Sequence, residues 1–195
     1  MVDTNEVKSF FDSLAGHWDD NMVINEKTID LILKNAGIKS NGKVLDVACG
    51  TGVLIPYYLD RGVSSVTAID ISLKMIEIAG NKFKSKNVVF ICDDAVNHTF
   101  DTEFDNIVVY NAFPHFGNPD GLIYNLSSCL KSGGRLTIAH SMSRDKINEH
   151  HGNISKNLFV DLMTIDELSD LVGRYLRVTI TVSDENMYQI VAEKC

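Results

Sequence analysis

The chain has 195 residues, of which 26 are acidic and 18 are basic, and its formal net charge at pH 7 is -8. Because contacts to phosphates require clustered Lys and Arg, this balance argues against a nucleic acid as the main partner. The four cysteines show no C-x-x-C spacing, and no apolar run approaches the length of a membrane span. We therefore expect a cytoplasmic protein without a membrane-spanning segment, folded as one domain over residues 1–195.

Two helices are predicted ahead of the first strand. The first has a single apolar face with helical spacing, made by Val7, Phe10, Phe11, Leu14 and Trp18. The second can be capped by Asn25 and stopped by Gly37. Residues 1–40 are thus a helical appendage, which could pack as fixed core against a sheet or act as a lid over a site.

Strands and helices then alternate. Strands are predicted at 43–48, 65–70, 87–91, 104–110 and 135–139, with helices at 52–60, from Ser72 to Phe83, and from Asn118 to Leu130. Residues 141–163 show no clear periodicity and are predicted to form a loop on the substrate side. A capping box at Thr164 opens a last helix, and 176–183 and 187–193 read as a hairpin. We predict an α/β fold: a Rossmann-like, mostly parallel seven-stranded sheet with helices on both faces and the last strand antiparallel.

The first strand ends in a glycine turn, Val44 to Gly52, of the G-x-G type. Strand, glycine turn and helix bring the backbone close to a nucleotide-like ligand at the carboxyl end of a sheet. The dinucleotide-binding motif has a third glycine at the position where this chain has Ile55, and the acid Asp46 would repel a pyrophosphate. These departures, together with the terminal hairpin, disfavour a dehydrogenase.

The string D-x-x-C-G-T-G at 46–52 resembles motif I of the class I S-adenosylmethionine-dependent methyltransferases. Asp70 ends the second strand, where a carboxylate can accept both ribose hydroxyl hydrogens. Phe-Phe-Asp at 10–12 and His-Trp-Asp at 17–19 resemble the family's amino-terminal segment that covers the cofactor. The resemblance implies S-adenosylmethionine as cofactor, with Asp94 on the adenine and Asp93 as the fallback. The implied cofactor-binding residues are Trp18, Asp46, Ala48, Gly50, Gly52, Asp70, Ile71, Met75, Asp94, Ala95 and Asn111.

The segments after the fourth and fifth strands emerge beside the reacting methyl group in such a fold. They carry the candidate catalytic residues Tyr110, His115 and His140, with His115 as the proposed proton acceptor or acceptor-orienting group. Four of the six histidines belong to this edge. Neutral imidazoles suit a divalent metal, so a metal site formed by His115, His140, His150 and His151 is a further hypothesis, beside a water-exposed substrate loop.

The favoured function is S-adenosylmethionine-dependent methyl transfer to a small-molecule acceptor. The resemblance is nearest to the group that includes quinone-biosynthesis C-methyltransferases, but the 141–163 segment departs from it. Two alternatives remain: a metal-assisted methyltransferase acting on a thiol, metalloid or metal-bound ligand, and a non-catalytic S-adenosylmethionine-binding protein. A homodimer is compatible with the sequence.

Overall fold

Seven strands form one sheet in the order β3-β2-β1-β4-β5-β7-β6. The computed structural model describes residues 2–20, 22–151 and 157–195, and at positions 150 and 151 it describes only the backbone. The strands are β1 (Lys43–Val47), β2 (Ser65–Asp70), β3 (Val88–Cys92), β4 (Phe104–Tyr110), β5 (Leu130–His140), β6 (Arg177–Ser183) and β7 (Tyr188–Glu193). The first five pair in parallel, and β7 lies antiparallel between β5 and β6. The predicted mostly parallel sheet with an antiparallel last strand is confirmed.

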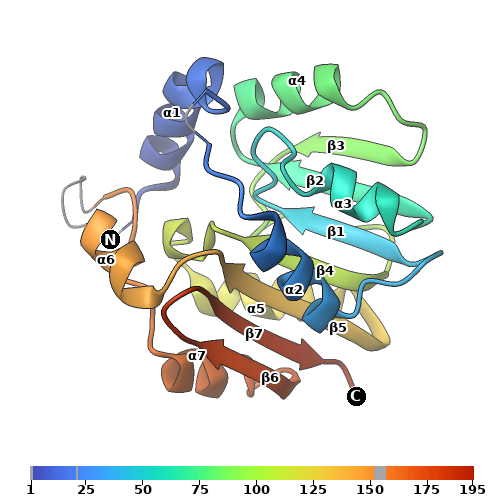
Figure 1. The fold of residues 1–195 in the computed structure, drawn as a ribbon, viewed down its shortest axis with the longest axis vertical. Helices are drawn as coiled ribbons and strands as arrows, with labels where there is room; N and C mark the ends of the chain where they lie inside the picture. Colours follow the sequence, from blue (N-terminus) through green and yellow to red (C-terminus); the bar gives the residue numbers. More distant parts are fainter. Residues whose placement is uncertain (1, 21, 152–156) are drawn as a thin grey trace.

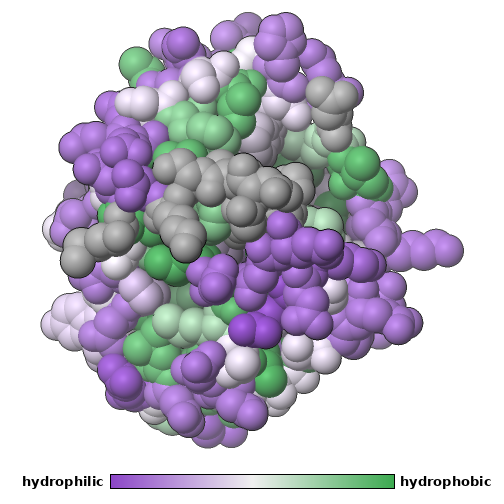
Figure 2. All heavy atoms as spheres, turned by 90° about the vertical axis from the view of Figure 1, so that its left-hand side faces the viewer, coloured by the Kyte–Doolittle hydropathy of each residue, from purple (hydrophilic) through white to green (hydrophobic). Residues whose placement is uncertain are grey.

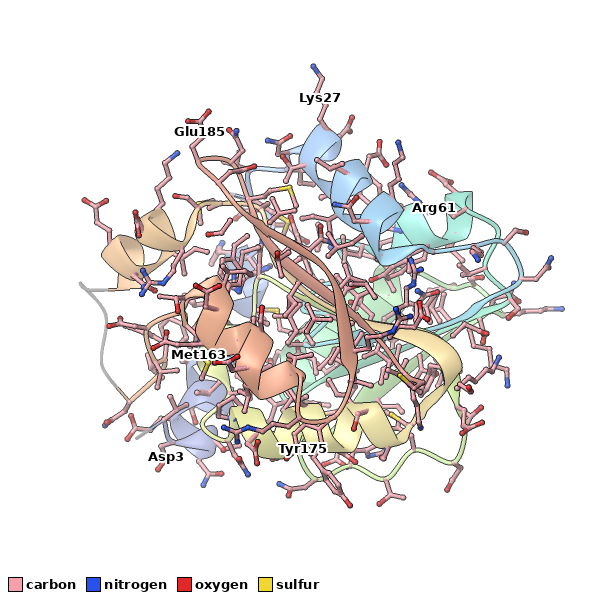
Figure 3. All side chains as sticks on the ribbon, turned by 90° about the horizontal axis from the view of Figure 1, so that it is seen from below. Asp3, Lys27, Arg61, Met163, Tyr175 and Glu185 are labelled. Atoms are coloured by element: carbon pink, nitrogen blue, oxygen red, sulfur yellow. The ribbon has the colours of Figure 1, made fainter. Side chains whose placement is uncertain are left out.

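Helices cover both faces of the sheet. They are α1 (Thr4–Leu14), α2 (Glu26–Ala36), α3 (Ile55–Asp60), α4 (Leu73–Lys82), α5 (Pro119–Ser128), α6 (Arg144–His151) and α7 (Ile165–Val172), with short 3-10 turns η1 (Ala15–His17) and η2 (Phe113–His115). Seen from below, α2 and α3 lie on one side of the strands, near Lys27 and Arg61, and α5 and α7 lie on the other, near Tyr175 and Met163 (Figure 3). Two apolar clusters, one between each pair of helices and the sheet, form the main core.

The helix ends follow from the capping residues. Asn25 accepts a hydrogen bond from the Thr28 amide at 3.2 Å, and Gly37 ends α2 in the left-handed conformation at φ 72°. At α7 both bonds of the predicted capping box are present. Helix α3 begins at Ile55 rather than at the predicted residue 52, because Gly52 has φ 87° and cannot start a right-handed helix.

One prediction about irregular structure was wrong. Residues 141–163 contain the helix α6, where a structureless loop was expected. Its sequence is almost entirely polar, and Ile147 is its buried apolar residue among those whose side chains are described. With so little apolar periodicity, the helix could not be recognised from the pattern. The Ser143 carbonyl accepts from the Ile147 amide at 3.1 Å and starts its first turn.

Strand order places the crevice of the fold. β1 pairs with β2 on one side and with β4 on the other, so the chain's crossovers run in opposite directions from this point. Ligands of open α/β sheets bind at such a switch point, outside the carboxyl ends of the strands. In Figure 1 this is the left-hand edge of the sheet, toward which the β1 arrow points and beside which α1 and α6 lie.

Candidate functional site

A cavity of about 880 Å³ lies at the carboxyl ends of the central strands. Its floor is formed by the segments that follow β1, β2, β3 and β4, and the amino-terminal segment forms its roof. Figure 2 looks onto this edge, where apolar side chains reach the surface among polar ones. The size is toward the upper end of the range of about 300–1,000 Å³ for small-molecule sites.

The glycine turn after β1 contributes backbone to the cavity. Ala48 and Gly50 both have φ 54° and both line it. Only glycine adopts this left-handed conformation without a steric cost, so Ala48 is strained where Gly50 is not. Gly52 serves packing instead, since a Cβ there would lie 2.7 Å from Cε2 of Phe83. Gly52 is needed for the packing of Phe83 on the turn. It was predicted to bind the cofactor, but the structure does not place it on the cavity wall.

Asp46 also lies away from the cavity wall, which corrects the expectation that it points into the turn toward a ligand. Its side chain faces the α3 layer, and the Tyr58 hydroxyl donates to its Oδ1 at 3.4 Å. It is 2% exposed, and burial raises its pKa to about 8. The carboxyl is therefore mostly neutral at pH 7, when it can serve as a hydrogen-bond donor below the turn.

Asp70 does line the cavity, at the end of β2. Its Oδ2 accepts from the Gly50 amide at 2.8 Å and its Oδ1 from the Ser72 amide at 2.9 Å. One carboxylate thus holds the glycine turn against the start of α4. Burial raises its pKa, although both amide bonds favour the charged form. Each carboxylate oxygen can accept more than one hydrogen bond, so capacity remains for a pair of ligand hydroxyls.

Both acids after β3 line the cavity, but they differ in what they bind. Asp93 pairs with Nδ1 of His98 at 2.7 Å, and this hydrogen bond lowers its pKa. Asp94 accepts from the Val96 amide at 3.0 Å and from the Asn97 side chain at 2.7 Å. Ile71, Met75 and Ala95 line the same cavity, and their contact with an adenine stays a prediction.

The segment after β4 adds polar groups on the opposite side of the turn. Tyr110 and Asn111 line the cavity, and Asn111 has φ 54°. Its side chain accepts from the Ser141 amide at 2.9 Å and donates to the Ser141 hydroxyl at 3.2 Å. Asn111 thus ties the ends of β4 and β5 together, which fixes the backbone beside Tyr110.

His115 lines the cavity from η2. Its Nδ1 lies 2.8 Å from the carbonyl oxygen of Leu158. Since a carbonyl can only accept, Nδ1 carries the proton and the lone pair of the neutral ring is on Nε2. Burial lowers the pKa of His115, so the ring is neutral at pH 7. The ring also meets Phe11 edge to face, with centroids 5.0 Å apart.

Of the other predicted histidines, His140 does not join His115. His140 is 3% exposed and packs its ring toward Tyr188, with centroids 6.2 Å apart, rather than lining the cavity. The side chains of His150 and His151 lie outside the described residues. Among the residues that the structure does describe, no group of three or more His, Cys, Asp or Glu is arranged to hold a metal ion.

The amino-terminal segment covers the cavity with one face of α1. Four side chains at helical spacing line it, namely Thr4, Val7, Phe11 and Leu14, and Trp18 follows. Phe11 and Trp18 meet edge to face at 5.6 Å. The sequence pattern assigned Val7, Phe10, Phe11, Leu14 and Trp18 to one face, of which all but Phe10 line the cavity, and it missed Thr4 because a polar residue does not belong to an apolar stripe.

Two carboxylates attach the amino-terminal segment to the glycine turn and to α4. Asp12 accepts from the Ser72 hydroxyl at 2.6 Å and from the Lys74 amide at 3.2 Å, at the first turn of α4. Asp19 accepts from the Thr51 hydroxyl at 2.6 Å and pairs with Lys82 at 2.7 Å. These are the acids of the two motifs at 10–12 and 17–19, so the sequence carried their signal without showing what they bind.

Comparison with known proteins agrees with this geometry. Residues 44–134 match a family model described as a methyltransferase domain. Over 142 residues the chain is 31% identical to a malonyl-[acyl-carrier protein] O-methyltransferase of Acetivibrio thermocellus, covering 71% of this chain and 50% of that protein. It is 31% identical over 144 residues to a demethylmenaquinone methyltransferase of Paenarthrobacter aurescens, covering 69% and 54%. The chain therefore spans about half the length of these curated relatives.

A solved structure extends the likeness in fold to almost the full chain. The N-methyltransferase NodS of Bradyrhizobium japonicum, in complex with S-adenosyl-L-homocysteine, superposes with a TM-score of 0.79 at 15% identity, covering 96% of this chain and 98% of that one. At this identity the likeness concerns the fold. Together with the glycine turn, the strand order and the matched family model, it places the chain in the class I S-adenosylmethionine-dependent methyltransferase family.

Proposed function

We propose that this protein transfers a methyl group from S-adenosylmethionine to a small-molecule acceptor inside the cavity. The observation that carries the proposal is that Gly50, Asp70 and Asp94 lie along one wall of a single cavity whose roof is α1. Within the family these are the positions expected to meet the methionine, ribose and adenine parts of the cofactor.

The residues fit that cofactor. Gly50 has no Cβ and a left-handed backbone, which leaves the turn open toward the cavity. Asp70 is already held by two backbone amides, so its carboxylate would meet the ribose without having to reorganise. Asp94 is held in the same way by Val96 and Asn97. When bound, S-adenosylmethionine supplies an electrophilic methyl group on a sulfonium centre.

The protein's own contribution would be positioning and exclusion of water. The α1 stripe closes the cavity with apolar side chains, and Asn111 fixes the end of β4 beside it. His115 can accept a proton at Nε2 from an acceptor that must lose one, since its Nδ1 is committed to Leu158. Such a base is needed only for an acceptor that enters protonated.

Kinship does not identify the acceptor. The two curated relatives are named for different acceptors, malonyl-[acyl-carrier protein] and demethylmenaquinone. The proposal is therefore limited to the small-molecule class. The metal-assisted alternative finds no support among the described residues, since His140 packs toward Tyr188 and no metal-binding group is formed.

Calorimetric titration with S-adenosylhomocysteine tests the cofactor, with NAD as the comparison ligand. Binding of the first and not of the second supports the proposal, and the reverse would replace it by a dehydrogenase. Turnover is then followed as S-adenosylhomocysteine formed from S-adenosylmethionine over a panel of small acceptors. Binding without turnover across the panel would favour the non-catalytic alternative. With an active acceptor, His115→Gln should lower kcat. It should also remove the part of the pH dependence of kcat that comes from protonation of His115.

A further inference from the structure

The described wall of the cavity carries acids and no fixed positive charge. Asp70, Asp93 and Asp94 line it, and none of the lining residues that the structure describes is Lys or Arg. Two histidines, His17 and His115, are the remaining candidates for positive charge. The His17 ring is 87% exposed and faces Asp20 at 2.9 Å, while burial lowers the pKa of His115 and keeps it neutral at pH 7.

Helix N-termini are the other common anion sites in proteins. Those of α1, α4 and α5 are capped by side chains, and at α3, which has no side-chain cap, the Ile55 amide donates to the Gly52 carbonyl at 3.1 Å and Pro56 has no amide hydrogen. The first turn of α4 donates to Ser72 and to the carboxylate of Asp12. At α5 the Asn118 side chain accepts from Gly121, and Pro119 has no amide hydrogen to offer. At α1 the Asp3 carboxylate accepts from two backbone amides. Their positive ends are thus met by the protein's own acceptors.

Away from Asp70 and Asp94 the cavity is lined by apolar side chains together with polar residues such as Thr4, Tyr110 and Asn111, which carry no charge at pH 7. Val7 and Phe11 project from α1, and Ala112 and Phe116 line it from the segment after β4. Phe11 stands edge-on to His115. An anion placed here would lose its hydration and gain no described cation or unclaimed helix end in return. Burial of an unpaired charge is among the most unfavourable events in a protein interior.

Resting on the proposed function, we propose that the methyl acceptor is an apolar molecule whose inserted end carries no negative charge, so that acceptors with a carboxylate or phosphate at that end are excluded from the part of the cavity beneath α1. The acidic wall selects a neutral or cationic molecule, and the apolar stripe of α1 selects its hydrophobic body. This inference about the charge of the acceptor comes from the residues that line the cavity and not from the names of related proteins.

Two fluorescent probes that differ only in charge test this. N-phenyl-1-naphthylamine is neutral, and 8-anilinonaphthalene-1-sulfonate is the same molecule with a sulfonate. Each is titrated into protein saturated with S-adenosylhomocysteine. This ligand lacks the positive sulfonium charge of S-adenosylmethionine, so a difference between the probes reports the charges of the cavity wall. The neutral probe should bind at least tenfold more tightly than the sulfonate.

A pair of charge variants locates the effect in the cavity. Thr4 lines the cavity, and its neighbour Asn5 is exposed on α1 without lining it. Thr4→Lys should strengthen binding of the sulfonate about threefold to tenfold at low salt, with the gain shrinking as salt is added. The neutral probe should be unaffected, and Asn5→Lys should change neither probe.

Three results would each overturn the inference: equal or tighter binding of the sulfonate by the unmodified protein, equal effects of the two lysine variants, or failure of both probes to bind. The proposed function is read separately, from the S-adenosylhomocysteine titration. If that ligand fails to bind, the function falls, and the probe ratio measured without it still reports the charge selectivity of the cavity.

Discussion

Removal of the Asp12 carboxylate should loosen the roof of the cavity while leaving the sheet intact. Asp12 accepts two hydrogen bonds from the start of α4, from the Ser72 hydroxyl at 2.6 Å and the Lys74 amide at 3.2 Å. A hydrogen bond to a charged group contributes roughly 1.5–3 kcal/mol net. Since Asp12 is partly exposed and the second bond is long, we expect Asp12→Ala to weaken docking of the segment by about 1–2 kcal/mol in total.

Hydrogen exchange of the α1 backbone amides measures this directly. A loss of about 1–2 kcal/mol corresponds to exchange that is about 5- to 30-fold faster in α1, with the amides of β1 and β4 unchanged. Asp20→Ala is the matched control, because Asp20 belongs to the same segment and its carboxylate pairs with His17 at the surface. Unchanged exchange of α1 in Asp12→Ala, or an equal effect of the control, would refute the role assigned to Asp12.

The pH dependence of the same contact has a definite sign. Burial opposes ionisation of Asp12, but the hydrogen bonds from Ser72 and Lys74 outweigh it, and the pKa is lowered. A lowered folded-state pKa means that the contribution is present at neutral pH and is lost as the pH falls through and below the usual value near 3.8. Protection of α1 should therefore fall on acidification in the unmodified protein and change less in Asp12→Ala.

Three more variants probe the floor of the site. Ala48→Gly should stabilise the protein by about 0.5–1 kcal/mol, because relief of a left-handed alanine exceeds the entropy that glycine adds to the unfolded chain; thermal unfolding measures it, and a lower Tm would contradict it. Asp70→Asn should weaken S-adenosylhomocysteine binding at least about tenfold by calorimetry, since it replaces a doubly anchored carboxylate; unchanged affinity in the folded variant would remove Asp70 from the cofactor site. Burial raises the pKa of Asp46 to about 8, so the free energy of unfolding of the unmodified protein should fall as the pH rises from about 4 to about 8. In denaturant titrations Asp46→Asn should make the free energy of unfolding less dependent on pH over this range. Parallel slopes for the two proteins would contradict a neutral Asp46.

The elements with strong local signals were predictable from the sequence. The apolar strands, the caps at Asn25, Ser72 and Thr164, and the terminal hairpin are all found, because each depends on residues close in the chain. Helix α6 was missed because its sequence gives almost no apolar periodicity. The start of α3 was misplaced because the turn at Gly52 extends further than the residue pattern suggests.

Side-chain direction was harder to predict than position. Asp46 and His140 both stand where functional residues were predicted, near the ends of β1 and β5. Successive residues of a strand point to opposite faces, so a shift of one position decides whether a side chain meets the cavity or a helix layer. Asp46 meets Tyr58, and the His140 ring packs toward Tyr188, which joins the sheet from a distant part of the chain.

The roof of the cavity could be only half predicted for a related reason. An apolar helix face shows in the sequence, but the partner that it covers does not, so core and lid looked alike. The lid hypothesis is favoured by the pair of acids at positions 12 and 19, which reach polar groups of Ser72, Lys74, Thr51 and Lys82 rather than apolar core. Polar contacts of this kind hold a segment with far less buried apolar surface than a core helix has, and segments held in this way open at lower free energy than the fold as a whole. A cavity with its cofactor and acceptor beneath such a roof can admit both and still exclude water when closed. The exchange experiment on Asp12 therefore tests both how the segment is attached and whether it behaves as a lid.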